Sequence, residues 1–141
     1  RLPSQSHLPL SPSKVAEHLY PLFTYAAEMI PEKYHSSTMV TYQATAGMRL
    51  LEESEQDAVY DALFEGLTKW PDFAFSALER RHIATLDGES EAYFAAVAAN
   101  YLQGVITADK KSNIDKEVVG ALDMGGSSTQ IVFHRKHDSQ T

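Results

Sequence analysis

Residues 120–133 place a carboxylate, two glycines and a run of hydroxyls between two apolar segments, in the order Gly-Ala-Leu-Asp-Met-Gly-Gly-Ser-Ser-Thr-Gln-Ile-Val-Phe. Glycines let backbone N–H groups approach an anion because no Cβ intervenes, and hydroxyls add donors. Asp123 repels phosphate by itself, so its place here makes sense if Mg²⁺ or Ca²⁺ joins carboxylate to phosphate oxygens, directly or through water. Gln130 could add a neutral oxygen ligand. The alternative is an ordinary β-hairpin around a Gly-Gly turn.

The overall composition makes a phosphate site depend on local chemistry. The net charge is -7, and an acidic surface repels nucleic acid backbones, which argues against a nucleic-acid partner. The sequence has no cysteine, which excludes a disulfide framework and a thiolate metal site. No pair of its 6 histidines stands at metal-ligand spacing on a common helix face. A bound phosphate would therefore rely on an oxygen-ligated cation and on backbone N–H groups.

The elements that position these residues alternate between helix and strand, which favours an α/β architecture. Apolar residues at helical spacing predict a helix from Ser13 to Pro31, and Pro21 either kinks it or opens a second helix in its first turn. Another helix is predicted to start near Ser54, with Asp57 as its capping-box partner. The remaining predicted elements are strands over 38–43, 81–86, 118–122 and 129–134, and a helix over 89–103 with Gly104 as its C-cap.

Two segments closely resemble conserved regions of the apyrase, or nucleoside triphosphate diphosphohydrolase, family. Residues 123–130 resemble the family's fourth conserved region, Asp-Leu-Gly-Gly-Ala-Ser-Thr-Gln, with Met124 in place of Leu and Ser127 in place of Ala. Residues 44–49 read Ala-Thr-Ala-Gly-Met-Arg and are identical to the family's second region.

A third segment, residues 86–91, continues to Asn-Tyr-Leu at 100–102 and resembles the family's Gly-x-x-Glu-Gly helix start with a downstream Asn-Tyr. The three segments occur in the family's order and at similar separations, and the resemblance extends over about residues 15–134. Two positions depart from the pattern: Ala92 replaces the glycine after the glutamate, and Ala96 replaces the usual tryptophan. The packing beside the glutamate is therefore expected to differ.

The resemblance implies an actin-like ATPase (ribonuclease H-like) fold, in which two α/β lobes surround a nucleotide cleft. The Pro- and Ser-rich residues 1–12 predict an irregular lead-in, and the resemblance predicts a partial first lobe over 13–106. Residues 107–141 would then form a linker and the phosphate-binding hairpin that opens the second lobe. The family's first region, which supplies another phosphate loop, is not found in the sequence, nor is the fifth. We therefore expect the chain to be a piece of a longer protein.

The resemblance also implies a role for each matched residue in metal-dependent hydrolysis of the terminal phosphate of nucleoside tri- or diphosphates, with Ca²⁺ or Mg²⁺ as the cofactor. Glu91 matches the base that activates the attacking water, and Thr45 and Ser128 match residues that hold that water or the phosphate. Asp123 and Gln130 match residues that organise the metal through its water shell. The phosphate-binding loop would comprise Gly125, Gly126, Ser127 and Ser128.

The residues by themselves leave alternatives open. Glu91 could be an ordinary acid in the first turn of a helix, and Thr45 could be a helix N-cap. Arg49 could clamp a phosphate, but its spacing does not direct it toward a cleft, and a structural role on the following helix is favoured.

The enzyme class also has alternatives. Exopolyphosphatases and guanosine-pentaphosphate phosphatases share Asp-x-Gly-Gly, but they tend to carry Glu at the position of Gln130 and lack the 44–49 match. A non-catalytic nucleotide-binding remnant is the third reading, and the isolated piece is expected to have negligible activity. The resemblance predicts an extracellular or secretory-pathway location, and it leaves a membrane anchor and the oligomeric state open.

Overall fold

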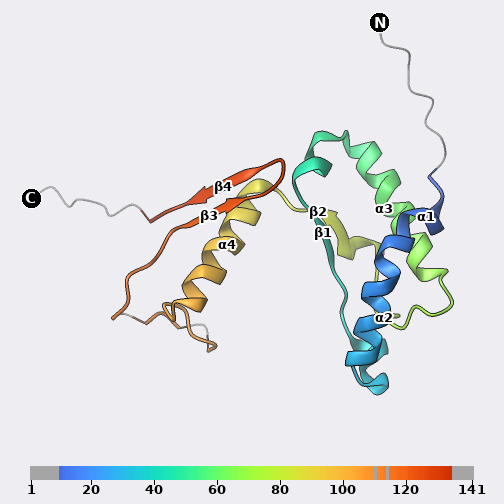
Figure 1. Ribbon diagram of the computed structural model, residues 1–141, viewed down its shortest axis with the longest axis horizontal. Coiled ribbons are helices and arrows are strands. Elements are labelled where there is room, and N and C mark those ends of the chain that lie inside the picture. The colour runs from blue at the N-terminus through green and yellow to red at the C-terminus, as the bar shows by residue number, and fades with distance from the viewer. Residues whose placement is uncertain (1–9, 110, 114, 135–141) are drawn as a thin grey trace, which may run out of the picture. The chain divides into compact units, whose positions relative to one another are not determined.

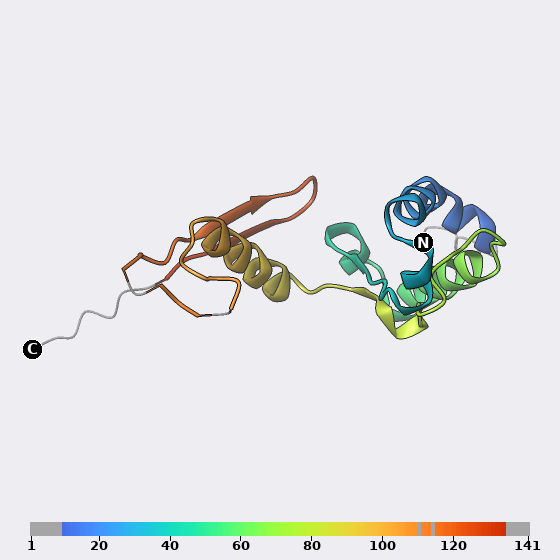
Figure 2. The same cartoon turned by 90° about the horizontal axis from the view of Figure 1, so that it is seen from below.

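The computed structural model describes residues 10–109, 111–113 and 115–134 (Figures 1 and 2). Helices and short strands alternate along the chain, which confirms the predicted mixed α/β composition. The described residues form two compact units. The first unit comprises residues 10–44 and 51–85, and the second comprises residues 45–50 and 86–134.

The first unit begins with two helices separated by a turn of 3-10 helix, η1 (Glu17–Leu19). Helix α1 spans Pro12–Ala16 and helix α2 spans Tyr20–Met29. Pro21 lies in the first turn of α2, where the missing backbone N–H would have had no partner in the helix. Of the two alternatives for Pro21, the structure shows the second: it opens a new helix.

Helix α3 spans Glu53–Thr68, close to the predicted start near Ser54, but its cap differs from the prediction. The Glu55 carboxylate accepts a hydrogen bond from the backbone N–H of Glu52 at 3.1 Å, so the box is built two residues earlier than predicted. Asp57, the predicted cap partner, instead contacts Arg80 at 2.8 Å. Arg80 lies 23 residues after Asp57, so the local spacing of residues around Asp57 could not predict this ion pair.

The strands of the first unit are shorter than predicted. Strand β1 (Tyr42–Ala44) pairs in parallel with β2 (Ile83–Thr85), and Gln43 lies opposite Ala84. Strand β2 starts later than predicted because the 3-10 helix η4 (Arg80–His82) takes up the first predicted positions. The 3-10 helix η2 (Glu32–Ser37) ends before the predicted start of β1, and residues 38–41 have no regular secondary structure.

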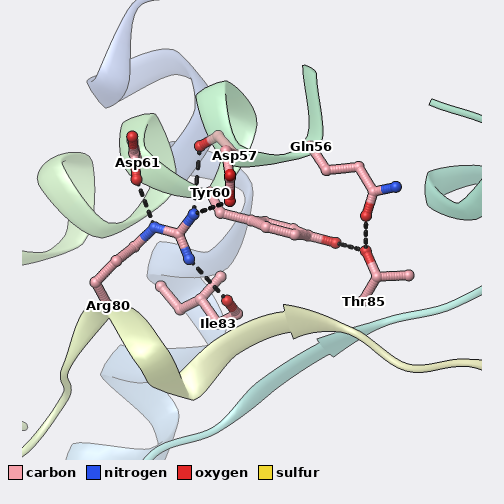
Figure 3. Close-up of polar contacts among 7 residues, drawn as sticks. All are labelled: Gln56, Asp57, Tyr60, Asp61, Arg80, Ile83 and Thr85. Atoms are coloured by element: carbon pink, nitrogen blue, oxygen red, sulfur yellow. Dashed lines mark hydrogen bonds and ion pairs between the residues drawn. The ribbon is translucent and has the colours of Figure 1, made fainter. Parts of the chain in front are cut away.

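Polar side chains fasten β2 to helix α3 (Figure 3). The guanidinium of Arg80 donates to Asp61 at 2.5 Å, to Asp57 and to the backbone oxygen of Ile83 at 3.0 Å. At the end of β2, the Tyr60 hydroxyl donates to Thr85, whose own hydroxyl donates to Gln56. Beneath these contacts lies the apolar core of the unit, in which the largest fully buried side chains are Phe75, Leu67 and Ile83.

The second unit contains the 3-10 turn η3 (Ala46–Leu50), helix α4 (Gly88–Leu102) and an antiparallel hairpin of β3 (Ala121–Met124) and β4 (Thr129–Val132). Helix α4 packs against both strands of the hairpin. Its bounds confirm the predicted helix to within one residue, and Gly104 has the left-handed φ of 68° expected of a C-cap. Strand β3 begins three residues later than the predicted strand over 118–122.

The compact units do not coincide with the predicted lobes over 13–106 and 107–141. Helix α4, predicted to belong to the first lobe, is part of the same unit as the hairpin because it packs on β3 and β4. The predicted lead-in over residues 1–12 lies mostly outside the described residues. The assignment of the units to lobes of an actin-like fold stays a prediction. In the part of the chain that the structure describes, none of the helices has the length and apolar character needed to cross a bilayer.

The contact between α1 and α3 gives a stability prediction for the first unit. A Cβ on Gly66 would lie 2.1 Å from the backbone oxygen of Pro12 and 2.7 Å from the Cβ of Ala16. Gly66→Ala should therefore lower the free energy of unfolding by about 1–3 kcal/mol through overpacking, although alanine is the better helix former by about 1 kcal/mol. Urea unfolding followed by the fluorescence of Trp70, the sequence's only tryptophan, measures the change.

The matched control is Ser54→Ala, at an exposed position of the same helix. It should leave stability unchanged or raise it slightly, because serine is the poorer helix former. Equal stability of Gly66→Ala and the wild-type protein would show that α1 does not pack closely on Gly66.

Candidate active site

The candidate base, Glu91, lies in the first turn of α4, and the residue before the helix fixes where that turn begins. Asp87 is the N-cap: its carboxylate accepts from the backbone N–H of Ser90 at 2.7 Å and from the Ser90 hydroxyl at 2.8 Å. These hydrogen bonds hold the pKa of Asp87 below its ordinary value, the one from the backbone N–H first and that from the hydroxyl second. Glu91 is one of the two acidic residues in this first turn, where the partial positive charge of the helix N-terminus attracts carboxylates.

Arg49 makes the most informative contacts of the second unit. Its Nη1 donates to Glu91 Oε2 at 2.7 Å and to the backbone oxygen of Leu86 at 2.8 Å, and its Nη2 donates to Ser128 Oγ at 3.1 Å. The side chains of Arg49 and Glu91 are only 22% and 16% exposed, so this pair is largely shielded from water. One guanidinium thus joins two predicted site residues. The expectation that Arg49 serves only the helix that follows it is wrong.

Thr45 lies in the same unit, directly after β1 and before η3. Its backbone oxygen accepts from the N–H of Met48 at 3.2 Å, and its half-buried hydroxyl makes no hydrogen bond among the described residues. The side-chain contact that defines a helix N-cap is therefore not seen there. The next residue, Ala46, has a left-handed φ of 45°, a conformation that costs a residue with a Cβ about 1–2 kcal/mol. Strained backbone of this kind is common at functional sites.

The hairpin brings the two predicted metal-organising residues side by side. Asp123 and Gln130 are direct cross-strand partners, so their side chains share one face of the hairpin. Gln130 is 9% exposed, whereas Asp123 is exposed. Among the residues that the structure describes, no three acidic or histidine side chains form a metal cluster. One carboxylate and one amide oxygen nevertheless fit a Mg²⁺ or Ca²⁺ ion that keeps several waters and also binds phosphate oxygens.

The two glycines of the hairpin turn differ in what the fold requires of them. The N–H of Gly125 donates to the backbone oxygen of Ser128 at 2.9 Å, and a Cβ on Gly125 would lie 3.3 Å from that oxygen. The tight turn therefore explains Gly125. A Cβ on Gly126 would meet nothing within 4 Å, and its φ is not left-handed. Neither crowding nor backbone conformation within the described residues demands a glycine at position 126.

A buried amide fixes α4 relative to the strand that carries Asp123. Asn100 is 4% exposed; its Nδ2 donates to the backbone oxygen of Val119 at 2.9 Å, and its Oδ1 accepts from the Val119 N–H at 3.0 Å. The same Nδ2 donates to the backbone oxygen of Ala96 at 2.8 Å. The Asn100 side chain thus bonds both backbone groups of Val119, as a neighbouring strand would, just before β3. Asn100, the first residue of the predicted Asn-Tyr pair, therefore has a structural role.

An open groove of about 510 Å³ runs beside the start of α4. It is lined by the first residues of the helix and by β4, and Gln130 is the predicted site residue that borders it. Ala92, which replaces the glycine of the family pattern, is one of the lining residues. The residues along the groove are Gly88, Glu89, Ala92, Tyr93, Thr129, Gln130, Ile131 and Val132.

Sequence reasoning missed two features of this unit. An Asp three residues before a Ser at a helix start is an N-cap pattern, so the cap at Asp87 could have been predicted. The contacts of Arg49 carried no such signal, because its partners Leu86, Glu91 and Ser128 lie 37, 42 and 79 residues along the chain.

The cap at Asp87 predicts how the start of α4 responds to pH. Because hydrogen bonds lower the pKa of Asp87 in the folded state, its stabilising effect is complete above the unfolded-state pKa of about 3.9. The effect is lost as the pH falls through the lower folded-state value. The NMR signal of the Ser90 N–H should therefore shift, and its protection relative to the exchange rate of an unstructured amide at the same pH should fall, as the pH drops below about 4. In Asp87→Asn, which keeps an acceptor but does not titrate, this signal should stay flat; a matching transition in that variant would contradict the assignment.

The sequence was also compared with known proteins. It is 39% identical to the Golgi apyrase of Saccharomyces cerevisiae over 122 residues, covering 86% of this chain and 19% of that protein. It is 38% identical over 118 residues to the guanosine-diphosphatase of Candida albicans, covering 84% of this chain and 19% of the relative. The human ectonucleoside triphosphate diphosphohydrolase 4 is 31% identical over 148 residues, with 93% of this chain and 24% of the relative covered.

The chain thus spans about a fifth of the length of these relatives. The family model of the GDA1/CD39 nucleoside phosphatases matches residues 3–141, which include the three segments that carry the resemblance. The chain therefore belongs to the GDA1/CD39 (nucleoside phosphatase) family.

Proposed function

We propose that this chain supplies the water-activating part of a metal-dependent nucleoside phosphatase, which releases the terminal phosphate of nucleoside tri- or diphosphates. The observation that carries the proposal is that Arg49 joins Glu91 on α4 to Ser128 beside the glycine turn. A candidate base and a candidate phosphate loop therefore belong to one unit of the fold. The relatives named apyrase, guanosine-diphosphatase and ectonucleoside triphosphate diphosphohydrolase support this class of reaction.

The carboxylate of Glu91 is arranged to take a proton from water. Arg49 engages Oε2, and Oε1 has no hydrogen-bond partner among the described residues. A water held by Oε1 could lose its proton to the carboxylate while its oxygen attacks the terminal phosphorus. The bond from phosphorus to the bridging oxygen breaks, and the departing nucleotide keeps the electron pair. The hydroxyls of Thr45 and Ser128 would orient this water or the phosphate.

The cofactor of the proposed reaction is Ca²⁺ or Mg²⁺, which would neutralise charge on the phosphate oxygens when bound. Asp123 and Gln130 would hold it through its water shell, because they are adjacent on the hairpin and offer oxygen ligands only. The turn formed by Gly125, Gly126, Ser127 and Ser128 would present backbone N–H groups and hydroxyls to the phosphate.

The activity is proposed for a longer protein, and the 141-residue chain alone should release phosphate at a negligible rate. Phosphate release from the isolated chain at rates like those of the longer protein would contradict this.

A location outside the cell or in the secretory pathway is supported by relatives named Golgi apyrase and ectonucleoside triphosphate diphosphohydrolase. Gln130 and residues 44–49 favour a nucleotide over polyphosphate as the substrate, and both substrates assayed side by side would separate the two.

The assigned base gives a direct test in the longer protein. Glu91→Gln keeps the size of the side chain and removes its basicity, so phosphate release should fall by about 10²–10⁴-fold with nucleotide affinity little changed. The measurement is phosphate release from nucleotides with added Ca²⁺ or Mg²⁺. Glu53→Gln is the matched control, because Glu53 is an exposed acid in the first turn of helix α3, in the first unit, and its variant should keep full activity. Full activity of Glu91→Gln would refute the assignment.

Gly126 gives a second test, because the fold itself does not require it. Gly126→Ala should change the free energy of unfolding by no more than about 0.5 kcal/mol, since the added Cβ meets open space. If a phosphate approaches this backbone closely, the same change should lower kcat/KM by about tenfold or more. Gly125→Ala, whose Cβ would crowd the Ser128 oxygen, should lose stability as well. Unchanged kcat/KM in Gly126→Ala would place the phosphate elsewhere.

A further inference from the structure

The contacts of Arg49 link three separate segments of the second unit. The backbone oxygen of Leu86 lies one residue before the N-cap of α4, Glu91 lies in the first turn of that helix, and Ser128 closes the hairpin turn. Arg49 itself belongs to η3, the short turn that follows Thr45. A single planar group therefore holds the turn over 45–50, the start of α4 and the hairpin in one arrangement.

We propose that Arg49 is a positioning residue, which fixes the Glu91 carboxylate and the Ser128 hydroxyl in the orientation that the reaction requires. This inference rests on the proposed function. A free glutamate side chain samples many rotamers, whereas a carboxylate oxygen bound to a guanidinium is confined. Holding reacting groups in a productive geometry removes entropy from the barrier, and small displacements can cost about a hundredfold in rate.

The hydrogen-bond inventory favours positioning over direct binding of phosphate. A terminal guanidinium nitrogen carries two N–H groups, and both on Nη1 have protein acceptors, Leu86 and Glu91. One N–H of Nη2 is used by Ser128. The adjacent carboxylate also offsets the positive charge. Lysine cannot reproduce this arrangement, because its ammonium is a point charge that lacks two nitrogens in a fixed plane.

The strained backbone beside Thr45 points to the same role. Ala46 holds a left-handed φ of 45°, and such residues persist only where their surroundings determine the conformation. Arg49, three residues later in the same turn, supplies contacts to α4 and to the hairpin. The interaction that orients Glu91 therefore also keeps the turn that begins at Thr45 in place.

The test compares Arg49→Ala, Arg49→Lys, Glu91→Gln and the double variant Arg49→Ala/Glu91→Gln in the longer protein. Arg49→Ala should lower kcat by about a hundredfold with KM within about threefold of the wild type, and Arg49→Lys should recover only part of the loss. The rate loss in the double variant should be smaller than the product of the two single losses, because Arg49 acts largely through Glu91. Arg81→Ala is the matched control: Arg81 makes an exposed ion pair with Glu79, and its loss should leave kcat unchanged.

A raised KM with unchanged kcat in Arg49→Ala would overturn the proposal and indicate a phosphate clamp. Rate losses that multiply in the double variant would also overturn it. Full activity of Glu91→Gln would instead refute the proposed base, so the two failures are distinguishable.

A separate measurement on the 141-residue chain does not depend on the reaction. Hydrogen exchange at the Met48 N–H, which donates to the Thr45 oxygen, should quicken by about tenfold or more in both Arg49→Ala and Arg49→Lys. Unchanged exchange in both variants would show that Arg49 does not hold the turn.

Discussion

The ion pair between Arg49 and Glu91 is the interaction on which the proposed chemistry depends. The two side chains are 22% and 16% exposed, so each charge has lost much of its contact with water and needs the other as compensation. A shielded pair of this kind has a fixed geometry, in contrast to the exposed pair of Lys69 and Glu65, whose side chains are 75% and 46% exposed. We therefore expect the Arg49–Glu91 pair to orient the Glu91 carboxylate, and we expect its loss to lower the kcat of phosphate release.

Helix α4 can orient its glutamate only because the helix is fastened at both ends. Asp87 caps its first turn, and Asn100 in its last turn bonds both backbone groups of Val119 just before β3. The buried amide of Asn100 costs free energy unless it is satisfied, so it specifies one register between helix and hairpin. Glu91 and Asp123 consequently belong to one compact unit, even though 32 positions separate them in the numbering.

Local signals in the sequence predicted the type and order of the main helices and strands, but not all of their bounds and not the contacts between them. Pro21, Gly104 and Gly125 each act on their own backbone, and the structure has a helix start, a helix end and a turn at those positions. Arg49 and Asn100 act across the fold, and a charged or amide side chain carries no periodic signal for its distant partner. The resemblance to conserved regions of the family pointed to residues 44–49, 86–91 and 123–130, which contain Arg49, Glu91 and Ser128. It did not predict that Arg49 contacts the other two.

Because Arg49 is paired with Glu91, the positive charge of its guanidinium is largely neutralised within the candidate site. Asp87, Glu89 and Asp123 add negative charge near the same helix start and hairpin, and the net charge of the chain is -7. Arg49 is already compensated by Glu91, so its guanidinium has little charge left for a nucleotide. An anionic substrate would therefore meet repulsion here unless a cation accompanied it. The charge of this region therefore supports the proposal that Asp123 belongs to a Ca²⁺ or Mg²⁺ site.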